Sequence, residues 1–423
     1  MKGRTLMAEI TIKPTKLKGE VTAPPSKSVA HRALICAALS GGSCKVSNIE
    51  LSDDIIATIG ALKALGADIL VNGSTAEIKG FRLNNDCDIN CLESGSTLRF
   101  LIPIAAALSV KTSFTGEGKL KERPIGEYIK ILSEKGVTFT DNKGKLPLSF
   151  SGKMSGGKFF VSGDVSSQYI SGLLLAFPLI NENCEIILSS NLESAPYIDI
   201  TIDVMNSFGV YVERTNTGFL VKKGQKYLAS DFSIEGDYSQ AAFWLCAAAL
   251  DSELTIKGLN PNSVQGDKAI INILKSFGAE ILLYDDTLTV KAKSLTAVEI
   301  DASQTPDLVP VLASLACFAK GQTIIRNAGR LVYKESNRLF AVEQSLKSIG
   351  ADITMTKDGF IIYGKETLKG GRASGFNDHR IVMSLAVAAT RCENDVIIEG
   401  YESVSKSYPR FFEEYKRLGG ITI

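Results

Sequence analysis

Lysine, arginine, serine and aspartate side chains recur at the starts of six otherwise apolar segments. The segments begin at Ser26, Gly95, Ser166, Tyr238, Thr305 and Asn377. A segment that is apolar all round is typical of a buried helix. The first turn of a helix presents unpaired backbone N–H groups and the positive end of the helix dipole, and phosphate or carboxylate groups bind readily there. The pattern therefore predicts several helix starts that bind anions.

The polar residues at these starts are Lys27, Ser28, Arg32, Ser96, Arg99, Ser166, Ser167, Gln168, Asp237, Asp307, Asp378, His379 and Arg380. Some of them have simpler explanations. Asp237 and Asp307 also suit ordinary helix caps, Lys27 and Arg32 could be surface charges, and His379 suits a structural histidine. Arg99 is harder to explain in this way, because an arginine inside an apolar helix needs an anionic partner.

Two charged segments lie outside the apolar helices. They are residues 119–126 (KLKERPIG) and 330–338 (RLVYKESNR). Glu335 and Arg338 are three residues apart, within reach of each other on a helix. Solvated surface charge would explain either segment alone, but Arg123, Lys334 and Lys406 add cations of the kind that an anionic ligand needs.

A five-residue motif ending in glycine recurs six times: LKALG at Gly66, LSEKG at Gly136, MNSFG at Gly209, LKSFG at Gly278, LKSIG at Gly350 and YKRLG at Gly419. Successive glycines are 69 to 73 residues apart. Glycine suits the left-handed end of a helix, and ADIL, VTFT, VYVE, AEIL, ADIT and GITI then supply strand-like patterns. The sequence predicts six repeats, with sheets outside and apolar helices inside.

Length and charge place further limits on the function. A chain of 423 residues predicts two domains, with three repeats on either side of the polar stretch 222–237. The 47 basic and 46 acidic residues nearly cancel, so no overall field favours nucleic acid or an anionic membrane. No stretch approaches the roughly 20 apolar residues that span a bilayer, and the N-terminus has no apolar signal core.

Eight cysteines occur without a CxxC motif. Several lie inside the apolar helices, where small buried thiols are common, so we expect reduced thiols and a cytoplasmic protein. Cys87 and Cys91 could form a ligand pair, but the chain has only two histidines. We therefore expect no metal site.

The motifs together resemble the enolpyruvyl transferase family. The resemblance is carried by PPSKSVAHRAL, ESGSTLRF, KERPIG, GDVSSQ, SAPYIDIT, EGDYSQAA, the TPD ending at Asp307, VYKESNRL, NDHR and SKSYPRFF, in order from residue 24 to residue 412. It implies an α/β fold of two domains, an inside-out α/β barrel with three βαβαββ repeats and buried helices in each domain. It places the first strand in the C-terminal half, so we expect domains of residues 21–232 and of residues 1–20 with 233–423.

The resemblance also implies a reaction. The enolpyruvyl group of phosphoenolpyruvate moves to the 5-hydroxyl of shikimate 3-phosphate, phosphate is released, and the product leads to chorismate and the aromatic amino acids. The residues implied for shikimate 3-phosphate are Lys27, Ser28, Arg32, Ser166, Ser167, Gln168, Ser194, Tyr197, Asp307 and Lys334. Those implied for phosphoenolpyruvate are Lys27, Gly95, Arg123, Gln168, Arg338, Arg380 and Lys406. Arginine forks suit such phosphate and carboxylate groups.

Addition to the double bond needs a base for the hydroxyl and an acid for the methylene carbon. The resemblance matches Asp307 to the hydroxyl proton and Glu335 to the methylene proton, with Lys27 as a third catalytic residue. It implies no cofactor. We expect a monomer whose two halves close on the substrates.

Three other functions fit parts of the pattern. The sister family that uses UDP-N-acetylglucosamine carries a reactive cysteine in the loop matching residues 119–126, and this loop has none. The related RNA 3′-terminal phosphate cyclases need a nucleophilic histidine, for which His379 is the only plausible candidate. A repeat scaffold that binds a partner protein could scatter its polar residues, whereas here they gather at equivalent helix starts. The sequence favours shikimate 3-phosphate as acceptor.

Overall fold

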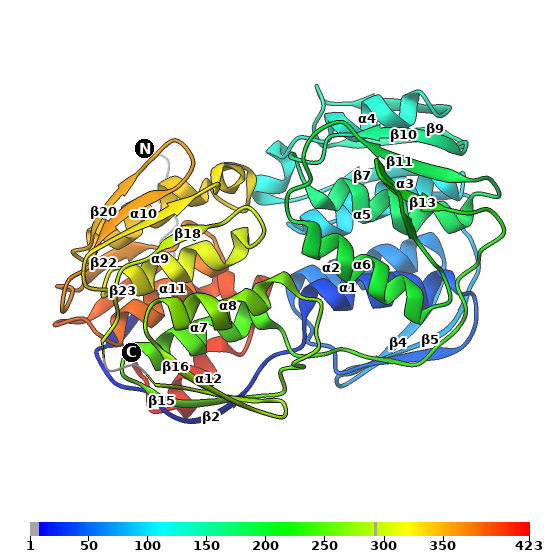
Figure 1. Cartoon of the computed structure of the whole chain (residues 1–423). Coiled ribbons are helices and arrows are strands. Elements are labelled where there is room, and N and C mark those ends of the chain that lie inside the picture. Colours follow the sequence, from blue (N-terminus) through cyan, green and yellow to red (C-terminus); the bar gives the residue numbers. More distant parts are fainter. Residues whose placement is uncertain (1–7, 292–293) are drawn as a thin grey trace. The chain divides into compact units, whose positions relative to one another are not determined.

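Six four-stranded sheets and the helices between them form two compact units in the computed structural model, which describes residues 8–291 and 294–423. One unit is Pro25–Glu235, called here the 25–235 unit. The other is the described part of Met1–Pro24 with Gly236–Ile423, called the 236–423 unit. Each unit has three of the sheets and a hydrophobic core of its own (Figure 1).

The sheets of the 25–235 unit have the strand orders β14-β3-β5-β4, β6-β7-β9-β8 and β10-β11-β13-β12. Their strands are β3 (Cys44–Ser47), β4 (Ala67–Asn72), β5 (Thr75–Phe81), β6 (Asp86–Asn90), β7 (Lys111–Thr115), β8 (Val137–Asp141), β9 (Leu148–Gly152), β10 (Gly157–Val161), β11 (Cys184–Leu188), β12 (Glu213–Arg214), β13 (Gly218–Val221) and β14 (Phe232–Ser233). Its α-helices are α1 (Lys27–Leu39), α2 (Asp53–Leu65), α3 (Gly95–Ala107), α4 (Gly126–Ser133), α5 (Ser167–Ala176) and α6 (Ala195–Ser207), with 3-10 turns η1 (Gly118–Glu122) and η2 (Phe177–Leu179).

The sheets of the 236–423 unit have the orders β16-β17-β15-β2, β18-β19-β21-β20 and β22-β23-β1-β24. Their strands are β1 (Glu9–Lys13), β2 (Lys18–Thr22), β15 (Glu253–Lys257), β16 (Glu280–Tyr284), β17 (Thr287–Lys291), β18 (Glu299–Asp301), β19 (Gln322–Arg326), β20 (Asp352–Met355), β21 (Phe360–Tyr363), β22 (Gly371–Ser374), β23 (Val396–Glu399) and β24 (Ile421–Thr422). Its helices are α7 (Tyr238–Ala249), α8 (Ile270–Ser276), α9 (Val309–Ala316), α10 (Arg338–Ser348), α11 (His379–Ala389) and α12 (Phe411–Arg417), with η3 (Gly266–Ala269), η4 (Pro306–Leu308), η5 (Gly329–Tyr333) and η6 (Tyr401–Lys406).

All six sheets repeat one topology. In β6-β7-β9-β8, for example, β6 and β7 are parallel and joined through α3, whereas β7, β9 and β8 pair antiparallel. Parallel neighbours need such a crossover helix. Two strands depart from chain order: β2 precedes α1 but pairs with β15, and β14 precedes α7 but pairs with β3. Strand β1 takes the third place in the last sheet, between β23 and β24.

The inner helices of each unit are the apolar segments that the sequence singled out. In the 236–423 unit, α7, α9 and α11 pack against one another (Figure 1). Every residue of α7 is buried. Trp244 of α7 stacks on Phe411 with ring centres 4.8 Å apart. In the 25–235 unit, α3 packs against α5, and α6 against both α1 and α5. The predicted fold of βαβαββ repeats with buried helices is confirmed. None of the helices in the described residues has the length and apolar character needed to cross a membrane.

The six repeated glycines close helices as predicted. Their φ angles are 118° at Gly66, 94° at Gly136, 79° at Gly209, 96° at Gly278, 100° at Gly350 and 90° at Gly419. This left-handed region costs other L-residues about 1–2 kcal/mol, which explains why glycine recurs at these positions.

The prediction of a strand at VYVE (residues 210–213) is wrong for most of that segment. Strand β12 contains only Glu213 and Arg214. The Gln225 side chain takes the place of a neighbouring strand: its Oε1 accepts from the Tyr211 backbone N–H (2.7 Å), and its Nε2 donates to the Tyr211 carbonyl (2.9 Å). A side chain that satisfies the backbone in this way removes the need for a strand partner.

Gly66 and Gly419 provide a matched test of how the repeated glycines end their helices. A Cβ on Gly66 would lie 1.9 Å from the Arg82 carbonyl oxygen, whereas a Cβ on Gly419 would have no neighbour within 4 Å. We expect Gly419→Ala to lower the free energy of unfolding by about 1 kcal/mol from backbone strain alone. Gly66→Ala should cost at least about 2 kcal/mol more, because the chain after β5 must also move. Urea unfolding of both variants measures this, and equal losses would contradict it.

Candidate functional site

A buried arginine organises the polar residues of the 236–423 unit. Arg338 begins α10 and is 1% exposed. Its Nε donates to Asp378 Oδ2 (2.8 Å), and its Nη1 donates to Asp307 Oδ1 (3.0 Å). Its Nη2 donates to Glu335 Oε2 (2.5 Å). Burial alone would lower the pKa of Arg338, but the carboxylates of Asp378, Glu335 and Asp307 raise it above its ordinary value. Arg338 therefore stays positively charged.

Asp307 lies in η4 and is the second centre of this cluster. Its Oδ1 accepts from Lys334 Nζ (3.1 Å), and its Oδ2 accepts from Arg380 Nη2 (3.2 Å). Arg380 Nη1 also donates to the Asp307 backbone carbonyl (2.9 Å). Burial favours a neutral Asp307, but Arg380, Lys334 and Arg338 together hold its pKa well below the ordinary value. Asp307 is thus a carboxylate shared by three cations.

Lys406 is held near the start of α11. The residue is buried at the end of η6, and its Nζ donates to the Asn377 carbonyl (2.8 Å). Phe376 and Asn377 have φ angles of 50° and 52°, an uncommon conformation for such residues that tends to mark functional segments. Asp378 then caps α11, because its Oδ1 accepts from the Arg380 backbone N–H (3.0 Å). One short segment therefore positions both Lys406 and Arg380.

The 25–235 unit has a buried arginine of its own on α1. Arg32 is 3% exposed, and its Nε donates to Thr201 Oγ1 (2.6 Å). Its guanidinium also donates to the carbonyls of Ser28 (2.7 Å) and Tyr197 (3.0 Å). Burial lowers the pKa of Arg32 to about 10, so the side chain is still a cation at neutral pH. These neutral partners orient the charge without cancelling it.

A second group of this unit surrounds Gly95, the first residue of α3. A Cβ on Gly95 would lie 2.6 Å from Nη1 of Arg123 and 2.9 Å from Nη1 of Arg99. Arg99 Nη1 donates to Gln168 Oε1 (2.9 Å), and Gln168 Nε2 donates to Ser96 Oγ (3.0 Å). Two guanidinium groups therefore lie close together against a backbone that has no side chain. Such a pair attracts an anion.

The loop that carries Arg123 is fastened to α5. Tyr169 Oη donates to the Pro124 carbonyl (2.7 Å), and the Arg99 guanidinium lies 5.6 Å above the Tyr169 ring. Ser166 caps α5 by accepting from the Gln168 backbone N–H (3.3 Å). The same helix start thus sets the positions of Gln168, Arg99 and Arg123.

Lys27 and Ser194 occupy two further helix starts. Lys27 begins α1 and forms an ion pair with Asp54 near the start of α2. Ser194 is the residue before α6, is buried, and has a φ of 54°. The Ser194 carbonyl accepts from the Tyr197 backbone N–H (3.1 Å). Ser194 therefore lies one turn before Tyr197, whose own carbonyl accepts from Arg32.

The two units differ in the residue at each inner helix start. The starts in the 236–423 unit carry aspartates: Asp237, Asp307 and Asp378. Those in the 25–235 unit carry serines: Ser26, Ser94 and Ser166. A serine cap adds no negative charge, so the positive end of the helix dipole can still attract an anion. Asp307 and Asp378 instead balance the arginines beside them.

The predicted site residues form recognisable groups within each unit. In the 236–423 unit Asp307, Lys334, Glu335, Arg338 and Arg380 form one ion-paired cluster. In the 25–235 unit, Gly95, Arg123 and Gln168 lie with Arg99, whereas Ser28, Arg32 and Tyr197 form a separate group, and Lys27 pairs with Asp54. Ser167 follows the Ser166 cap at the start of α5.

Sequence reasoning did not name Asp54 or Thr201, and it named Asp378 only as a polar residue at a helix start and not as a partner of Arg338. Asp378 stood beside the predicted Arg380, but its partner Arg338 is 40 residues away. Asp54 follows the helix cap Ser52 and reads as an ordinary first-turn acid.

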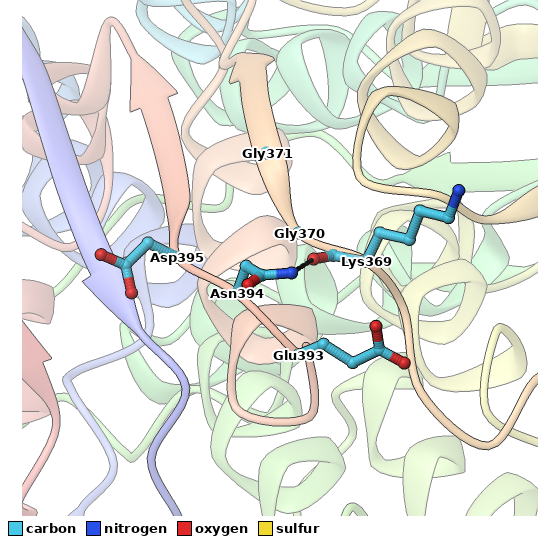
Figure 2. Close-up of a pocket in the computed structure, with 6 residues that line it drawn as sticks. All are labelled: Lys369, Gly370, Gly371, Glu393, Asn394 and Asp395. Carbon is cyan, nitrogen blue, oxygen red and sulfur yellow. Dashed lines mark hydrogen bonds between the residues drawn. The ribbon is translucent and has the colours of Figure 1, made fainter.

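A surface hollow of about 640 Å³ lies elsewhere, lined by Lys369, Gly370, Gly371, Glu393, Asn394 and Asp395 (Figure 2). Asn394 Nδ2 donates to the Lys369 carbonyl (2.9 Å), and the Gly371 N–H donates to the Asp395 carbonyl (2.9 Å). The hollow contains none of the predicted site residues. In the part of the chain that the structure describes, no three His, Cys, Asp or Glu side chains gather as a metal site requires.

Comparison with known proteins identifies the class. Residues 12–415 match the family model described as EPSP synthase (3-phosphoshikimate 1-carboxyvinyltransferase). The chain is 47% identical to the 3-phosphoshikimate 1-carboxyvinyltransferase of Clostridium kluyveri and 46% identical to that of Clostridium perfringens, with 98% of this chain and 98% and 99% of those proteins covered. A solved EPSP synthase from Acinetobacter baumannii superposes with a TM-score of 0.83 at 26% identity, over 98% of this chain and 99% of that one. The chain belongs to the EPSP synthase family.

The ionised state of Asp307 predicts a pH-dependent contribution to stability. Because the folded pKa is lower than the unfolded one, this contribution is present above the unfolded pKa of about 4 and is lost as the pH falls through the folded pKa. We expect Asp307→Asn to lower the free energy of unfolding by about 3–5 kcal/mol at pH 7, because three cations lose a buried partner.

The difference between Asp307→Asn and the parent should not shrink between pH 7 and about pH 4.5, and it should shrink below about pH 4. Denaturant unfolding at several pH values measures it. The exposed Asp285→Asn is the control, and we expect no loss there. A difference that shrinks between pH 7 and pH 5 would contradict the ion-pair explanation.

Proposed function

We propose that the groups described above bind the two substrates of the family reaction and move its protons. The chain is a transferase that moves the enolpyruvyl group of phosphoenolpyruvate to the 5-hydroxyl of shikimate 3-phosphate, with release of phosphate, on the route to the aromatic amino acids. The observation that carries the assignment of residues is the set of buried cations around Asp307 and around Gly95. Both substrates are small anions, which such cations recognise.

Shikimate 3-phosphate is assigned to the hydroxyl-rich helix starts. Its residues are Lys27, Ser28, Arg32, Ser166, Ser167, Gln168, Ser194 and Tyr197 in the 25–235 unit, with Asp307 and Lys334 in the other. The serine caps support this assignment, since helix starts without an acidic cap favour a phosphate group. Arg32 supports it too, because all of its described partners are uncharged.

Phosphoenolpyruvate is assigned to the arginines and lysines. Its residues are Lys27, Gly95, Arg123, Gln168, Arg338, Arg380 and Lys406. The absence of a side chain at Gly95 lets a ligand approach the backbone between two guanidinium groups. Arg338 and Arg380 share the Asp307 carboxylate, so an incoming carboxylate or phosphate can take over part of that pairing.

The proton transfers are assigned to Asp307, Glu335 and Lys27. Addition joins the 5-hydroxyl oxygen to C2 of phosphoenolpyruvate while the hydroxyl proton leaves to a base and a proton reaches the methylene carbon. Elimination then expels phosphate and returns the methyl proton to the protein. Asp307 is ionised and suits the base, and Glu335, whose position Arg338 fixes, is assigned to the methylene proton.

We further propose that the two units are the two domains of the family fold, with residues 21–232 in one and residues 1–20 with 233–423 in the other. The breaks between the units fall after Pro24 and Glu235. We propose a monomer, since each unit has its own core, and a cytoplasmic location, since eight buried cysteines without a disulfide suit a reducing compartment.

Phosphate release tests the substrate assignment. Purified protein with phosphoenolpyruvate and shikimate 3-phosphate should release phosphate, and UDP-N-acetylglucosamine should not replace the acceptor. Asp307→Asn and Glu335→Gln should each lower kcat by about 10²–10⁴-fold, the usual contribution of a positioned acid or base. The exposed Glu280→Gln is the matched control and should keep parental kcat. Near-parental turnover in either variant would remove that residue from its role.

Gly95→Ala tests the phosphoenolpyruvate assignment. The new methyl group would push against the guanidinium groups of Arg123 and Arg99. We expect the KM for phosphoenolpyruvate to rise by at least about tenfold, because small misplacements of binding groups are costly, with a smaller change in the KM for shikimate 3-phosphate. Gly60→Ala is the control, since it lies on the exposed face of α2 with no neighbour within 4 Å. Equal effects on both KM values would argue against the assignment.

A further inference from the structure

A series of buried side-chain hydrogen bonds joins α1, α2 and α3 in the 25–235 unit, and the assignments above do not use it. His31 Nδ1 on α1 lies 2.7 Å from Thr58 Oγ1 on α2, and Thr58 Oγ1 lies 2.7 Å from Thr97 Oγ1 on α3. Thr97 Oγ1 in turn donates to Ser94 Oγ (2.7 Å). All four side chains are at most 1% exposed. We call this series the His31 network.

One end of the His31 network sets the start of α3. Ser94 Oγ accepts from the backbone N–H (3.2 Å) and from the hydroxyl (2.7 Å) of Thr97. A cap of this kind satisfies an N–H group that the helix itself leaves unpaired. Gly95 follows Ser94 directly, so a shift of the cap would move the backbone that lies against the guanidinium groups of Arg99 and Arg123.

The other end of the His31 network is one turn from Lys27. His31 lies four residues after Lys27 on α1, and Thr58 lies four residues after Asp54 on α2. Residues four apart share one face of a helix. The contact of His31 with Thr58 and the ion pair of Lys27 with Asp54 are therefore neighbouring links between the same two helices. Loss of the first link would loosen the second.

Counting hydrogens gives the His31 network a direction. Each hydroxyl has one hydrogen. Thr97 Oγ1 gives its hydrogen to Ser94 Oγ, because its other acceptor, the Asp54 carbonyl, is 3.5 Å away. Thr58 Oγ1 must then be the donor to Thr97, and it can only accept from His31. The hydrogen of the His31 ring therefore belongs on Nδ1.

Two further observations support a neutral His31 with its hydrogen on Nδ1. Burial, together with the charges of Lys27 and Arg32, lowers the pKa of His31 well below its ordinary value, so the ring has a single N–H at neutral pH. Among the residues that the structure describes, none forms a hydrogen bond with the buried His31 Nε2. A hydrogen on Nε2 would be unpaired, and an unpaired buried N–H is costly.

We propose that His31 is a positioning residue for the reaction: with its hydrogen on Nδ1, it orients the hydrogen bonds that hold Gly95 and Lys27 at the proposed phosphoenolpyruvate site. The inference rests on the proposed roles of Gly95 and Lys27. Binding groups keep a productive geometry only when the residues behind them are held in place by packing and hydrogen bonds. The His31 network does this without adding a charge beside an anion site.

Nitrogen NMR tests the direction of the His31 network without substrate. The protein has only two histidines, so the ring signals that disappear in His31→Asn belong to His31. We expect the long-range 1H–15N spectrum of the parent at neutral pH to show a neutral His31 ring that is protonated at Nδ1. A ring protonated at Nε2, or at both nitrogens, would overturn the proposal.

Two threonine variants test the effect on phosphoenolpyruvate. Thr58→Val and Thr97→Val each remove one hydroxyl and nearly keep the shape of the side chain. Each should raise the KM for phosphoenolpyruvate by about three- to tenfold, because small misplacements of binding groups are costly, with a smaller change in the KM for shikimate 3-phosphate. Thr112→Val is the matched control and should keep the parental values. Thr112 is also 1% exposed and donates to the Val110 carbonyl (3.0 Å), but it lies on β7, outside the His31 network.

A pair of variants tests His31 itself. His31→Asn keeps an N–H near the position of Nδ1, whereas His31→Leu removes it. His31→Leu should raise the KM for phosphoenolpyruvate by about tenfold, and the KM of His31→Asn should stay within about threefold of the parent. Adding Thr58→Val to His31→Leu should raise the KM little further, since partners in one network are not additive. Equal KM values in the two His31 variants would show a packing role alone and would overturn the proposal.

The outcomes separate this inference from the proposed function. A parental KM for phosphoenolpyruvate in both threonine variants would overturn the positioning role of His31. Failure of the parent protein to release phosphate would instead count against the proposed function, and the NMR spectrum would still report which nitrogen of His31 carries the hydrogen. If His31→Leu does not fold, the threonine variants and the parent spectrum decide the question.

Discussion

The buried Arg338 and its carboxylate partners are the interaction on which the site of the 236–423 unit depends. A guanidinium that is 1% exposed is tolerable only if its hydrogen bonds and its charge are matched. Asp378 caps α11, Asp307 leads into α9, and Arg338 begins α10. One side chain therefore ties together the starts of three helices, and the helices cannot shift separately without leaving a buried charge unpaired. The rigidity that catalysis needs follows from this electrostatic requirement.

The repeated fold provides six inner helix starts, and it does not determine which residues occupy them. Each repeat buries one apolar helix behind a four-stranded sheet, so the core is determined by apolar pattern and the helix starts are free to vary. Serine caps in one unit and aspartates in the other give similar backbones different charges. The first arrangement leaves the helix dipole available to a phosphate group, and the second stores cations in ion pairs.

The sequence predicted what depends on local pattern and missed what depends on pairing over long distances. The closing glycines, the inner helices and the strands after them follow from periodicity and from backbone conformation, and they are confirmed. The strand at VYVE was wrong because Gln225 satisfies the Tyr211 backbone from 14 residues away. The pairing of Lys27 with Asp54 and the hydrogen bonding of His31 depend on which surfaces pack together, and no local rule contains that information.

The ion pairs also explain how a strongly held carboxylate could act as a base. Asp307 has a pKa well below its ordinary value, and a carboxylate of low pKa is a weak base. Its cations are those assigned to the anionic groups of the substrates. When a substrate carboxylate or phosphate takes hydrogen bonds from Arg338 and Arg380, Asp307 loses part of its stabilisation and its pKa must rise. Substrate binding would then create the base at the moment when a hydroxyl is present, so these ion pairs would confine proton transfer to the protein with substrate bound.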